Sequence, residues 1–408
     1  MIKSGLSAFR GRHILLLQGP VGPFFSRLAR DLEWVGAIVT KIDFNGGDWL
    51  FSPAGSIAFR GRMEEWPVFF DQVLVSRQID VVLLFGDCRP IHRVAYAIAI
   101  KRRLEIGVFE EGYIRPDYIT LERFGVNGHS RIPNTPDFYV NMPPADIPPT
   151  RNVGKTFWYA VLWSILYYLA SVLLRPLFHH YKHHRPLTLW EAWPWVRSCW
   201  RKFYFALKER GIQAELQSTF SGQFYLVPLQ VYNDAQIHVH SDFETVEAFI
   251  CHVISSFARF APSDTLLVIK HHPRDRGYLD YTVMIQNFVK IHGVEKRVLY
   301  IHDLHLPTLL QHARGIVVVN STVGLSALMR KKPTKVCGTA VYDIEGLTFQ
   351  GALDDFWISS QDYKITKDLF EHFRSYLIER TQVNGSFYRR LDVAQSNAGL
   401  VWPVFPVR

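Results

Sequence analysis

The sequence predicts an α/β protein that contains two parallel sheets. Short apolar runs alternate with longer stretches of helical periodicity in both halves of the chain, which is the pattern of parallel strands joined by helices. Polar residues cluster directly after several of the apolar runs, where the carboxyl ends of parallel strands form ligand sites. The chain has 408 residues, which is more than one ordinary hydrophobic core accommodates. We therefore expect two Rossmann-like domains.

The composition is that of a globular protein with an anionic partner. Hydrophobic residues make up 48% of the chain, and the formal net charge is +9. The positive charge favours a nucleotide, a nucleic acid or an anionic lipid surface as partner. The four cysteines lack paired spacing, which indicates reduced thiols in a cytosolic protein rather than disulfides or a zinc site. The first residues contain no apolar core of a secretion signal, so none is predicted.

Polar residues follow three predicted strands of the first half. The predicted strands are 13–17, 37–44, 80–86 and 106–109, and the predicted helices are 24–34, 66–77 and 91–103. Carboxyl ends of neighbouring parallel strands share one sheet edge, so Gly19/Gly22, Asp87/Arg89 and Glu110/Glu111 are expected to converge there. The glycines could let a ligand approach the backbone. The turn contains neither GxGxxG nor a Walker lysine, which argues against a dinucleotide site or a P-loop.

The segment between the two halves lacks their regular alternation of predicted strands and helices. Residues 114–130 have no clear period and are interpreted as a loop that carries binding groups, and the proline-rich segment 133–149 as a stiff linker. The uncharged stretch 157–174 is long enough for a transmembrane helix, but a single span would separate the halves of one α/β architecture. Its tyrosines, tryptophans and basic flanks favour a helix on an anionic membrane surface. A helix buried in the protein is the alternative. His179, His180, His183 and His184 have a chelating spacing, but a solvated basic face is preferred.

The second half repeats the alternation of strands and helices. Strands are predicted at 224–229, 266–270, 298–302, 315–319 and 334–337, and helices within 187–215 and at 243–259, 281–292, 306–312, 325–330 and 366–380. The expected domains are an N-terminal domain (1–150), a membrane-associating helical segment (151–222), a C-terminal domain (223–365) and a helix that crosses back (366–408).

The stretch 265–277 ends a buried strand in a burst of basic side chains. Lys270, His271, His272, Arg274 and Arg276 offer up to five donors, and Pro273 marks the strand's end. Such an edge suits an anion, most often phosphate. A helix follows Ser321 and Thr322, which can cap it and leave backbone N–H groups for an anion. A solvated basic loop is the alternative for the basic residues.

Three ordered motifs together resemble a known enzyme class. Glu110-Glu111-Gly112, His272-Pro273 and Ser321-Thr322 are similar to the acidic-Gly, His-Pro and Ser-Ser/Thr motifs of bacterial glycosyltransferases that use CMP-activated nonulosonic or octulosonic sugars. The stretches 112–117, 119–122 and 227–230 extend the match. The sequence resembles the capsule polysaccharide biosynthesis family, and within it the β-Kdo transferases that start a lipid-linked Kdo linker. The resemblance covers most of the chain and is weakest over 152–221.

The resemblance implies a fold, substrates and a location. The fold would be GT-B-like, with two Rossmann-like domains that face a cleft, and the donor would be CMP-β-Kdo. The acceptor would be a lyso-phosphatidylglycerol-type lipid at the inner membrane, with retention at the sugar and no metal or other cofactor. The expected location is cytoplasmic and peripheral on the inner membrane. A second Kdo transferase and the capsule exporter are possible partners, and no nucleic-acid recognition fold is predicted.

The motifs assign candidate roles to particular side chains. Glu111 or Glu110 would be the acid/base, and Asp234 a nucleophile or donor contact, whereas a solvated strand end and a loop cap are the alternatives. Arg89 and Arg115 could bind the Kdo carboxylate, although surface roles are equally compatible. The candidate donor-binding residues are Gln230, Lys270, His272, Pro273, Arg274, Asn320, Ser321 and Thr322, and the candidate substrate-binding residues are Gly19, Gly22, Asp87, Arg89, Gly112 and Arg115.

Two other functions fit the same sequence. One is transfer of a different CMP-sugar, such as a sialic acid. The other is a non-catalytic role in capsule export or assembly, in which the protein binds lipid-linked polymer.

Overall fold

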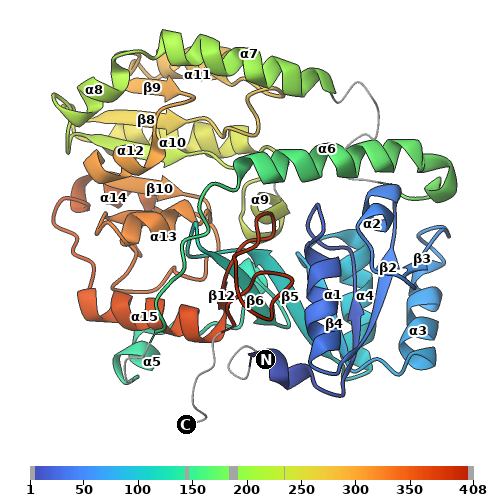
Figure 1. Ribbon diagram of the computed structural model, residues 1–408. Helices are drawn as coiled ribbons and strands as arrows, with labels where there is room; N and C mark the ends of the chain where they lie inside the picture. The colour runs from blue at the N-terminus through green and yellow to red at the C-terminus, as the bar shows by residue number, and fades with distance from the viewer. Residues whose placement is uncertain (1–4, 143–146, 183–191, 234, 403–408) are drawn as a thin grey trace. The chain divides into compact units, whose positions relative to one another are not determined.

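The chain folds into two compact units, each built on a sheet (Figure 1). The computed structural model describes residues 5–142, 147–182, 192–233 and 235–402. The first unit comprises residues 1–131, 144–189 and 374–408, and the second unit comprises 132–143 and 190–373. No helix among these residues is long and apolar enough to cross a membrane.

The first unit contains a seven-stranded sheet in the order β12-β6-β5-β4-β1-β2-β3. Its strands are β1 (His13–Leu16), β2 (Ile38–Asp43), β3 (Ile57–Ala58), β4 (Val81–Phe85), β5 (Glu105–Glu111), β6 (Tyr118–Arg123) and β12 (Gln382–Asn384). Strands β1 to β5 are parallel, and β6 is antiparallel to both β5 and β12. The order of the parallel strands is that of a Rossmann fold.

Helices cover both faces of the first sheet, which explains why its central strands β1 and β4 are almost entirely apolar. The helices of this unit are α1 (Phe24–Trp34), α2 (Gly46–Leu50), α3 (Trp66–Ser76), α4 (Pro90–Lys101) and α6 (Phe157–Leu173), with short 3-10 turns η1 (Gly5–Phe9), η2 (Asn127–His129) and η3 (Arg175–Phe178). Successive strand residues point to opposite faces. In β1, Leu16 accordingly joins the core under α1, and Leu15 joins the core under α3 and α4.

The second unit contains a five-stranded, all-parallel sheet in the order β11-β10-β7-β8-β9. Its strands are β7 (Phe224–Pro228), β8 (Leu266–Lys270), β9 (Val298–Ile301), β10 (Gly315–Val318) and β11 (Thr334–Val336). Its helices are α5 (Pro136–Val140), α7 (Ala192–Lys208), α8 (Ile212–Gln217), α9 (Ala235–His240), α10 (Val246–Phe260), α11 (Thr282–Ile291), α12 (Leu306–His312), α13 (Val323–Leu328) and α14 (Leu353–Ser359). The predicted α/β class with two Rossmann-like halves is confirmed.

The main error in the predicted elements concerns residues 114–130. They were expected to form a loop, but they include β6, in which Ile119 and Leu121 are buried. β6 pairs with β12, whose residues lie more than 250 positions later in the chain. β6 also pairs antiparallel with β5, through the connection 112–117, so it lies between a local and a distant partner strand. The sequence analysis did not recognise this connection as a turn between two paired strands. Helices α2, α9 and α14 were also not predicted, and neither was α5, which lies in the segment 133–149 that was expected to be a stiff linker.

The units divide the chain differently from the predicted domains. Residues 151–222 do not form one body, because α6 belongs to the first unit and α7 and α8 to the second. Two glycines allow α6 to lie directly on α2: a Cβ atom at Gly46 would be 2.3 Å from the carbonyl oxygen of Ala170, and one at Gly47 would be 2.6 Å from the hydroxyl of Ser171. Helix α15 (Lys367–Arg380) runs across the division, and β12 then joins the first sheet.

Candidate functional site

A glutamine follows the first strand of each Rossmann-like sheet and bonds to the residues that follow the fourth strand. After β1, the Oε1 atom of Gln18 accepts a hydrogen bond from Arg89 at 2.9 Å. After β7, the Nε2 atom of Gln230 donates to Oδ1 of Asn320 at 3.0 Å. The strand order reverses between these strands, and α/β sheets bind ligands at that switch point. Each unit thus has one candidate ligand-binding edge.

In the second unit, the edge is built from the ends of β7 and β10. The backbone N–H of Asn320 donates to Oε1 of Gln230 at 3.3 Å, so the two side chains form a reciprocal pair. The hydroxyl of Ser321 accepts the N–H of Val323 at 3.2 Å at the start of α13. The N-cap position of α13 is Thr322, which makes no side-chain cap bond, so the only predicted residue that bonds at this helix start is Ser321, one position earlier. Gln230, Asn320, Ser321 and Thr322 lie together at this edge, as predicted.

Three of the five basic side chains after β8 are buried in the unit rather than presented at the edge. Lys270 donates to the carbonyl of His302 at 2.8 Å, and burial lowers the pKa of Lys270 to about 8. The Nδ1 atom of His271 lies 2.6 Å from the hydroxyl of Tyr300, and burial lowers the pKa of His271 to about 3. Arg276 is also buried, in an ion pair. The expectation of five donors at this edge is wrong, because these three residues stabilise the loop itself.

The remaining two basic residues, His272 and Arg274, lie at the surface with Pro273 between them. The backbone N–H of Arg274 donates to Nδ1 of His272 at 3.2 Å. Since Nδ1 accepts this bond, a neutral His272 ring carries its proton on Nε2. His272 is thus oriented as a hydrogen-bond donor through Nε2, the arrangement required to contact a phosphate oxygen.

In the first unit, the paired glutamates end β5. Their side chains lie on opposite faces of the sheet, because strand residues alternate. The Oε1 atom of Glu110 accepts the backbone N–H of Glu111 at 2.9 Å, and Oε1 of Glu111 accepts the hydroxyl of Tyr388 at 2.8 Å. Both glutamates are half-buried. Glu111 is therefore held by the C-terminal tail, whereas Glu110 turns toward the end of β4, where its Oε2 is 3.6 Å from the Cβ position of Gly86.

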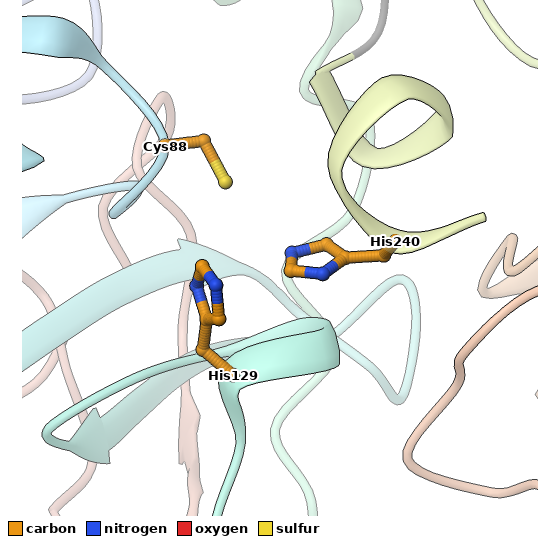
Figure 2. A group of neighbouring side chains, drawn as sticks. All are labelled: Cys88, His129 and His240. Atoms are coloured by element: carbon orange, nitrogen blue, oxygen red, sulfur yellow. The ribbon is translucent and has the colours of Figure 1, made fainter. Parts of the chain in front are cut away.

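Asp87 secures the loop that follows β6. Its buried carboxylate accepts the N–H of Val126 at 3.1 Å and lies 3.2 Å from Nδ1 of His129. Figure 2 shows the His129 ring beside Cys88, whose thiol is 3.3 Å from the other oxygen of Asp87. His240, also drawn there, belongs to α9 of the second unit. Asp87 thus has a structural function that the sequence did not indicate, beside its predicted substrate role.

The three candidate glycines have packing functions. A Cβ atom at Gly19 would lie 2.8 Å from the ring of Phe25. Gly22 has φ +104°, and a Cβ atom there would lie 2.9 Å from Trp163 of α6. At Gly112 a Cβ atom would lie 1.9 Å from a backbone oxygen of β6. Close packing by protein atoms accounts for all three glycines, and approach of a ligand to their backbone stays a prediction.

Two predicted side chains remain to be placed. Arg115 is exposed, and its Nε donates to the carbonyl of Gly112 at 3.1 Å. Asp234, the candidate nucleophile, lies outside the described residues. His183 and His184 of the histidine cluster also lie outside them.

A buried polar network that was not predicted from the sequence extends from the residues that follow β1 and β4. Asp48 accepts hydrogen bonds from Gln18 at 3.1 Å and from the Tyr167 hydroxyl at 3.0 Å, and burial raises the pKa of Asp48. Tyr167 belongs to α6, so the network joins Arg89 through Gln18 and Asp48 to that helix. The Asn-Gly-Gly-Asp turn before α2 hints at a helix cap, but only the tertiary structure brings Tyr167 to it.

Glu122, a buried glutamate of β6, is expected to make the stability of the first unit depend on pH. Glu122 accepts a hydrogen bond from the Tyr113 hydroxyl at 2.6 Å and another from Ser130. Burial raises the pKa of Glu122 from 4.5 to about 7. Between these values the folded chain keeps a proton that the unfolded chain releases, so the contribution of Glu122 to the free energy of unfolding falls as pH rises from 4.5 to 7.

We expect Glu122→Gln, which mimics the protonated acid, to remove this dependence. The loss across the range is about 3 kcal/mol from the pKa difference. Melting temperatures at pH 5 and pH 8 measure it, with the exposed Glu371→Gln as the control. The variant is expected to lose less stability than the parent between the two pH values. Equal losses in variant and parent would contradict the assignment.

Comparison with known proteins shows the family to which the chain belongs. A family profile described as "Capsule polysaccharide biosynthesis protein" matches residues 80–388. The chain belongs to this family. It is 42% identical to the capsule polysaccharide export protein KpsS of Escherichia coli, over 93% of this chain and 97% of that protein. It is 40% identical to the capsule polysaccharide modification protein LipB of Neisseria meningitidis serogroup A, over 94% of each.

Solved structures with a similar fold include KpsC of Thermosulfurimonas dismutans, described as a β-Kdo 2,7 transferase. The TM-score is 0.42 at 14% sequence identity, with 92% of this chain and 93% of that chain covered. The chain is therefore a capsule polysaccharide biosynthesis protein that is built on two Rossmann-like sheets.

Proposed function

We propose that the protein transfers Kdo from CMP-Kdo to a (lyso)phosphatidylglycerol-type lipid and thereby starts the β-Kdo linker of a capsular polysaccharide. The observation that carries the proposal is the donor set at the switch point of the second unit. Gln230, Asn320 and Ser321 lie at the ends of β7 and β10, and His272 follows β8, the neighbour of β7. His272 and Ser321 belong to the motifs that resemble those of CMP-sugar transferases, and Gln230 ends the stretch 227–230 that extends the resemblance.

In the proposed reaction, the bond between the anomeric carbon of Kdo and the CMP phosphate breaks, and a bond to an acceptor hydroxyl oxygen forms. CMP leaves with an additional negative charge on its phosphate, which hydrogen-bond donors must stabilise. His272 Nε2–H and the groups around Ser321 and Thr322 would supply these donors, with Arg274 as a further cation. The transfer would require no metal ion.

The acidic partner would be Glu111, with Glu110 as the alternative. The carboxylate would take the proton of the acceptor hydroxyl. Retention at the sugar calls for a second carboxylate as nucleophile in a double displacement, the role for which Asp234 is the candidate. Arg89 or Arg115 would hold the Kdo carboxylate, since a guanidinium matches a carboxylate in geometry. The Kdo transfer would take place on the cytoplasmic surface of the inner membrane. A second Kdo transferase and the capsule exporter would act on the product in later steps.

A mass-spectrometric transfer assay tests the proposal. Purified protein is mixed with freshly generated CMP-Kdo and a fluorescent lyso-phosphatidylglycerol analogue, with and without a metal chelator. The expected result is a product heavier by one Kdo and unaffected by the chelator. Binding of CMP-Kdo without transfer would contradict the acceptor, and neither binding nor transfer would overturn the Kdo assignment.

Two alternatives are separated by the same assay. Transfer from CMP-sialic acid but not from CMP-Kdo would identify a different CMP-sugar transferase. The name of the Escherichia coli relative favours a second candidate, a non-catalytic role in export. Normal capsule assembly in cells that carry Glu111→Gln would support that role.

A further inference from the structure

Helix α7 is attached to the second unit by one face only. Phe205 is buried and stacks on the imidazole of His302, with 3.4 Å between ring centroids. On the same face, Arg201 forms an ion pair with Asp280 at 3.2 Å and donates to the carbonyl of Arg276 at 2.9 Å. These contacts fix the rotation of the helix about its own axis. The opposite face is therefore presented to solvent in a defined orientation.

That opposite face is an apolar and aromatic stripe. Its exposed side chains recur three or four positions apart, so they lie along one side of the helix. Trp200 is 64% exposed and Phe203 is 76% exposed. The full stripe consists of Trp193, Val196, Trp200, Phe203, Tyr204 and Leu207. Exposure of contiguous large apolar side chains usually marks an interaction site.

Helix α6 of the first unit has the same construction. Its inner face is held by Tyr167 and Ser171, which are buried and hydrogen-bonded to α2 and the turn before it. Its outer face exposes Trp158 (73%) together with Leu162 and Leu169. The full outer stripe consists of Phe157, Trp158, Tyr159, Leu162, Ile165, Leu169 and Leu173. Each unit thus carries one helix of 17 residues with an uncovered aromatic face.

The charges around both stripes have one sign. Neither segment 147–182 nor segment 192–208 contains an aspartate or glutamate. The exposed basic residues of the two segments are Arg151, Lys155, Arg175, Lys182, Lys202 and Lys208. Tryptophan and tyrosine beside lysine and arginine is the composition of helices that lie in the interface of an anionic bilayer. A stripe that docks another protein surface would not need to exclude acidic residues over both segments.

We propose that the outer faces of α6 and α7 bind the surface of an anionic phospholipid bilayer, with each helix lying in the plane of the interface. The aromatic and aliphatic side chains would enter the boundary between headgroups and acyl chains, and the exposed lysines and arginines would contact lipid phosphates. The inference deepens the proposed function, since it names the surface from which a lipid acceptor would be taken. It rests on that function only for the identity of the acceptor, because vesicle binding requires neither donor nor transfer.

Co-sedimentation of the full chain with vesicles tests the inference without CMP-Kdo. Vesicles of pure phosphatidylcholine are compared with vesicles that contain phosphatidylglycerol. We expect strong binding to the anionic vesicles only, reduced by added salt. The double variants Trp200→Glu/Phe203→Glu in α7 and Leu162→Glu/Leu169→Glu in α6 are each expected to weaken binding at least tenfold. Lys202→Gln and Lys208→Gln are each expected to weaken it about fivefold, the effect of one basic residue at an anionic surface.

Exposed apolar residues elsewhere provide matched controls. Trp34 at the end of α1 is 72% exposed, and Ile291 at the end of α11 is 76% exposed. Trp34→Glu and Ile291→Glu are expected to leave vesicle binding unchanged. Circular dichroism and melting temperature identify variants that fail to fold. If a double variant is misfolded, the two lysine variants still test the inference.

Two results would overturn the inference. One is equal binding of parent and stripe variants to anionic vesicles. The other is a parent protein that does not bind vesicles but forms dimers, together with stripe variants that are monomeric. In that case the stripes would be covered by a second copy of the chain. Absence of Kdo transfer with intact vesicle binding would contradict the proposed function and leave the bilayer surface supported.

Discussion

Replacement of Glu111 by glutamine is expected to reduce Kdo transfer by a factor of about 10²–10⁴, the usual contribution of a general acid or base. Glutamine keeps the size of the side chain and an oxygen that can accept the Tyr388 hydroxyl, so the fold is expected to be preserved. The loss is expected in kcat with little change in the KM for CMP-Kdo, because in the proposed mechanism the carboxylate would act on the proton of the acceptor hydroxyl. Steady-state kinetics with the lipid analogue measure both constants.

Two other glutamates of β5 provide the controls. Glu105 lies at the amino end of the strand, where it pairs with Arg12 and Arg123, so Glu105→Gln is expected to leave the rate within about twofold of the parent, as for a surface ion pair. Glu110→Gln discriminates between the paired carboxylates, since Glu110 lies on the opposite face of the sheet. If Glu110→Gln lost activity and Glu111→Gln kept it, the roles of the two residues would be exchanged. Full activity in both variants would remove the acid/base from β5.

Replacement of His272 by alanine is expected to reduce transfer by a factor of about 10²–10³, as observed when one preorganised donor to a developing charge is removed. The hydrogen bond from the Arg274 backbone N–H to Nδ1 leaves Nε2 as the donor. The imidazole ring is therefore already oriented in the folded protein before the donor substrate binds. In the proposed reaction, the proton on Nε2 would stabilise the charge that develops on the CMP phosphate as the bond to the sugar breaks. The loss is therefore expected chiefly in kcat/KM, and rapid-quench measurements assign it to the sugar-transfer step.

His292, at the end of α11, serves as the matched histidine. It bonds to Ser255 at 3.3 Å, away from the strand ends, and His292→Ala is expected to leave transfer unchanged. A His272→Ala variant with normal kcat/KM would exclude the phosphate contact. A loss of the same size in His292→Ala would show that the effect comes from lost stability rather than from lost charge stabilisation. Melting temperatures of both variants equal to that of the parent would exclude a loss of stability.

Local sequence signals were sufficient for most of the scaffold. Apolar runs bounded by turn residues located β1, β4, β7 and β8 to within a residue or two, because parallel strands covered on both faces must be apolar throughout. The polar residues that follow such strands could be assigned to one edge of a sheet, since parallel strands end together. For that reason Gln230, Asn320 and Ser321 were placed correctly beside one another within the second unit.

The tertiary structure decided which of those polar residues face outward. Lys270, His271 and Arg276 share the basic burst with His272, but only tertiary contacts show that the three are buried with partners of their own. On the far side of β6, the sheet is completed by β12, a partner strand from the distant C-terminus. The sequence by itself determined most of the parallel strands and the two aromatic helices, because these depend on local periodicity. The direction of each side chain depends on neighbours brought together from distant parts of the chain, and that information exists only once the chain has folded.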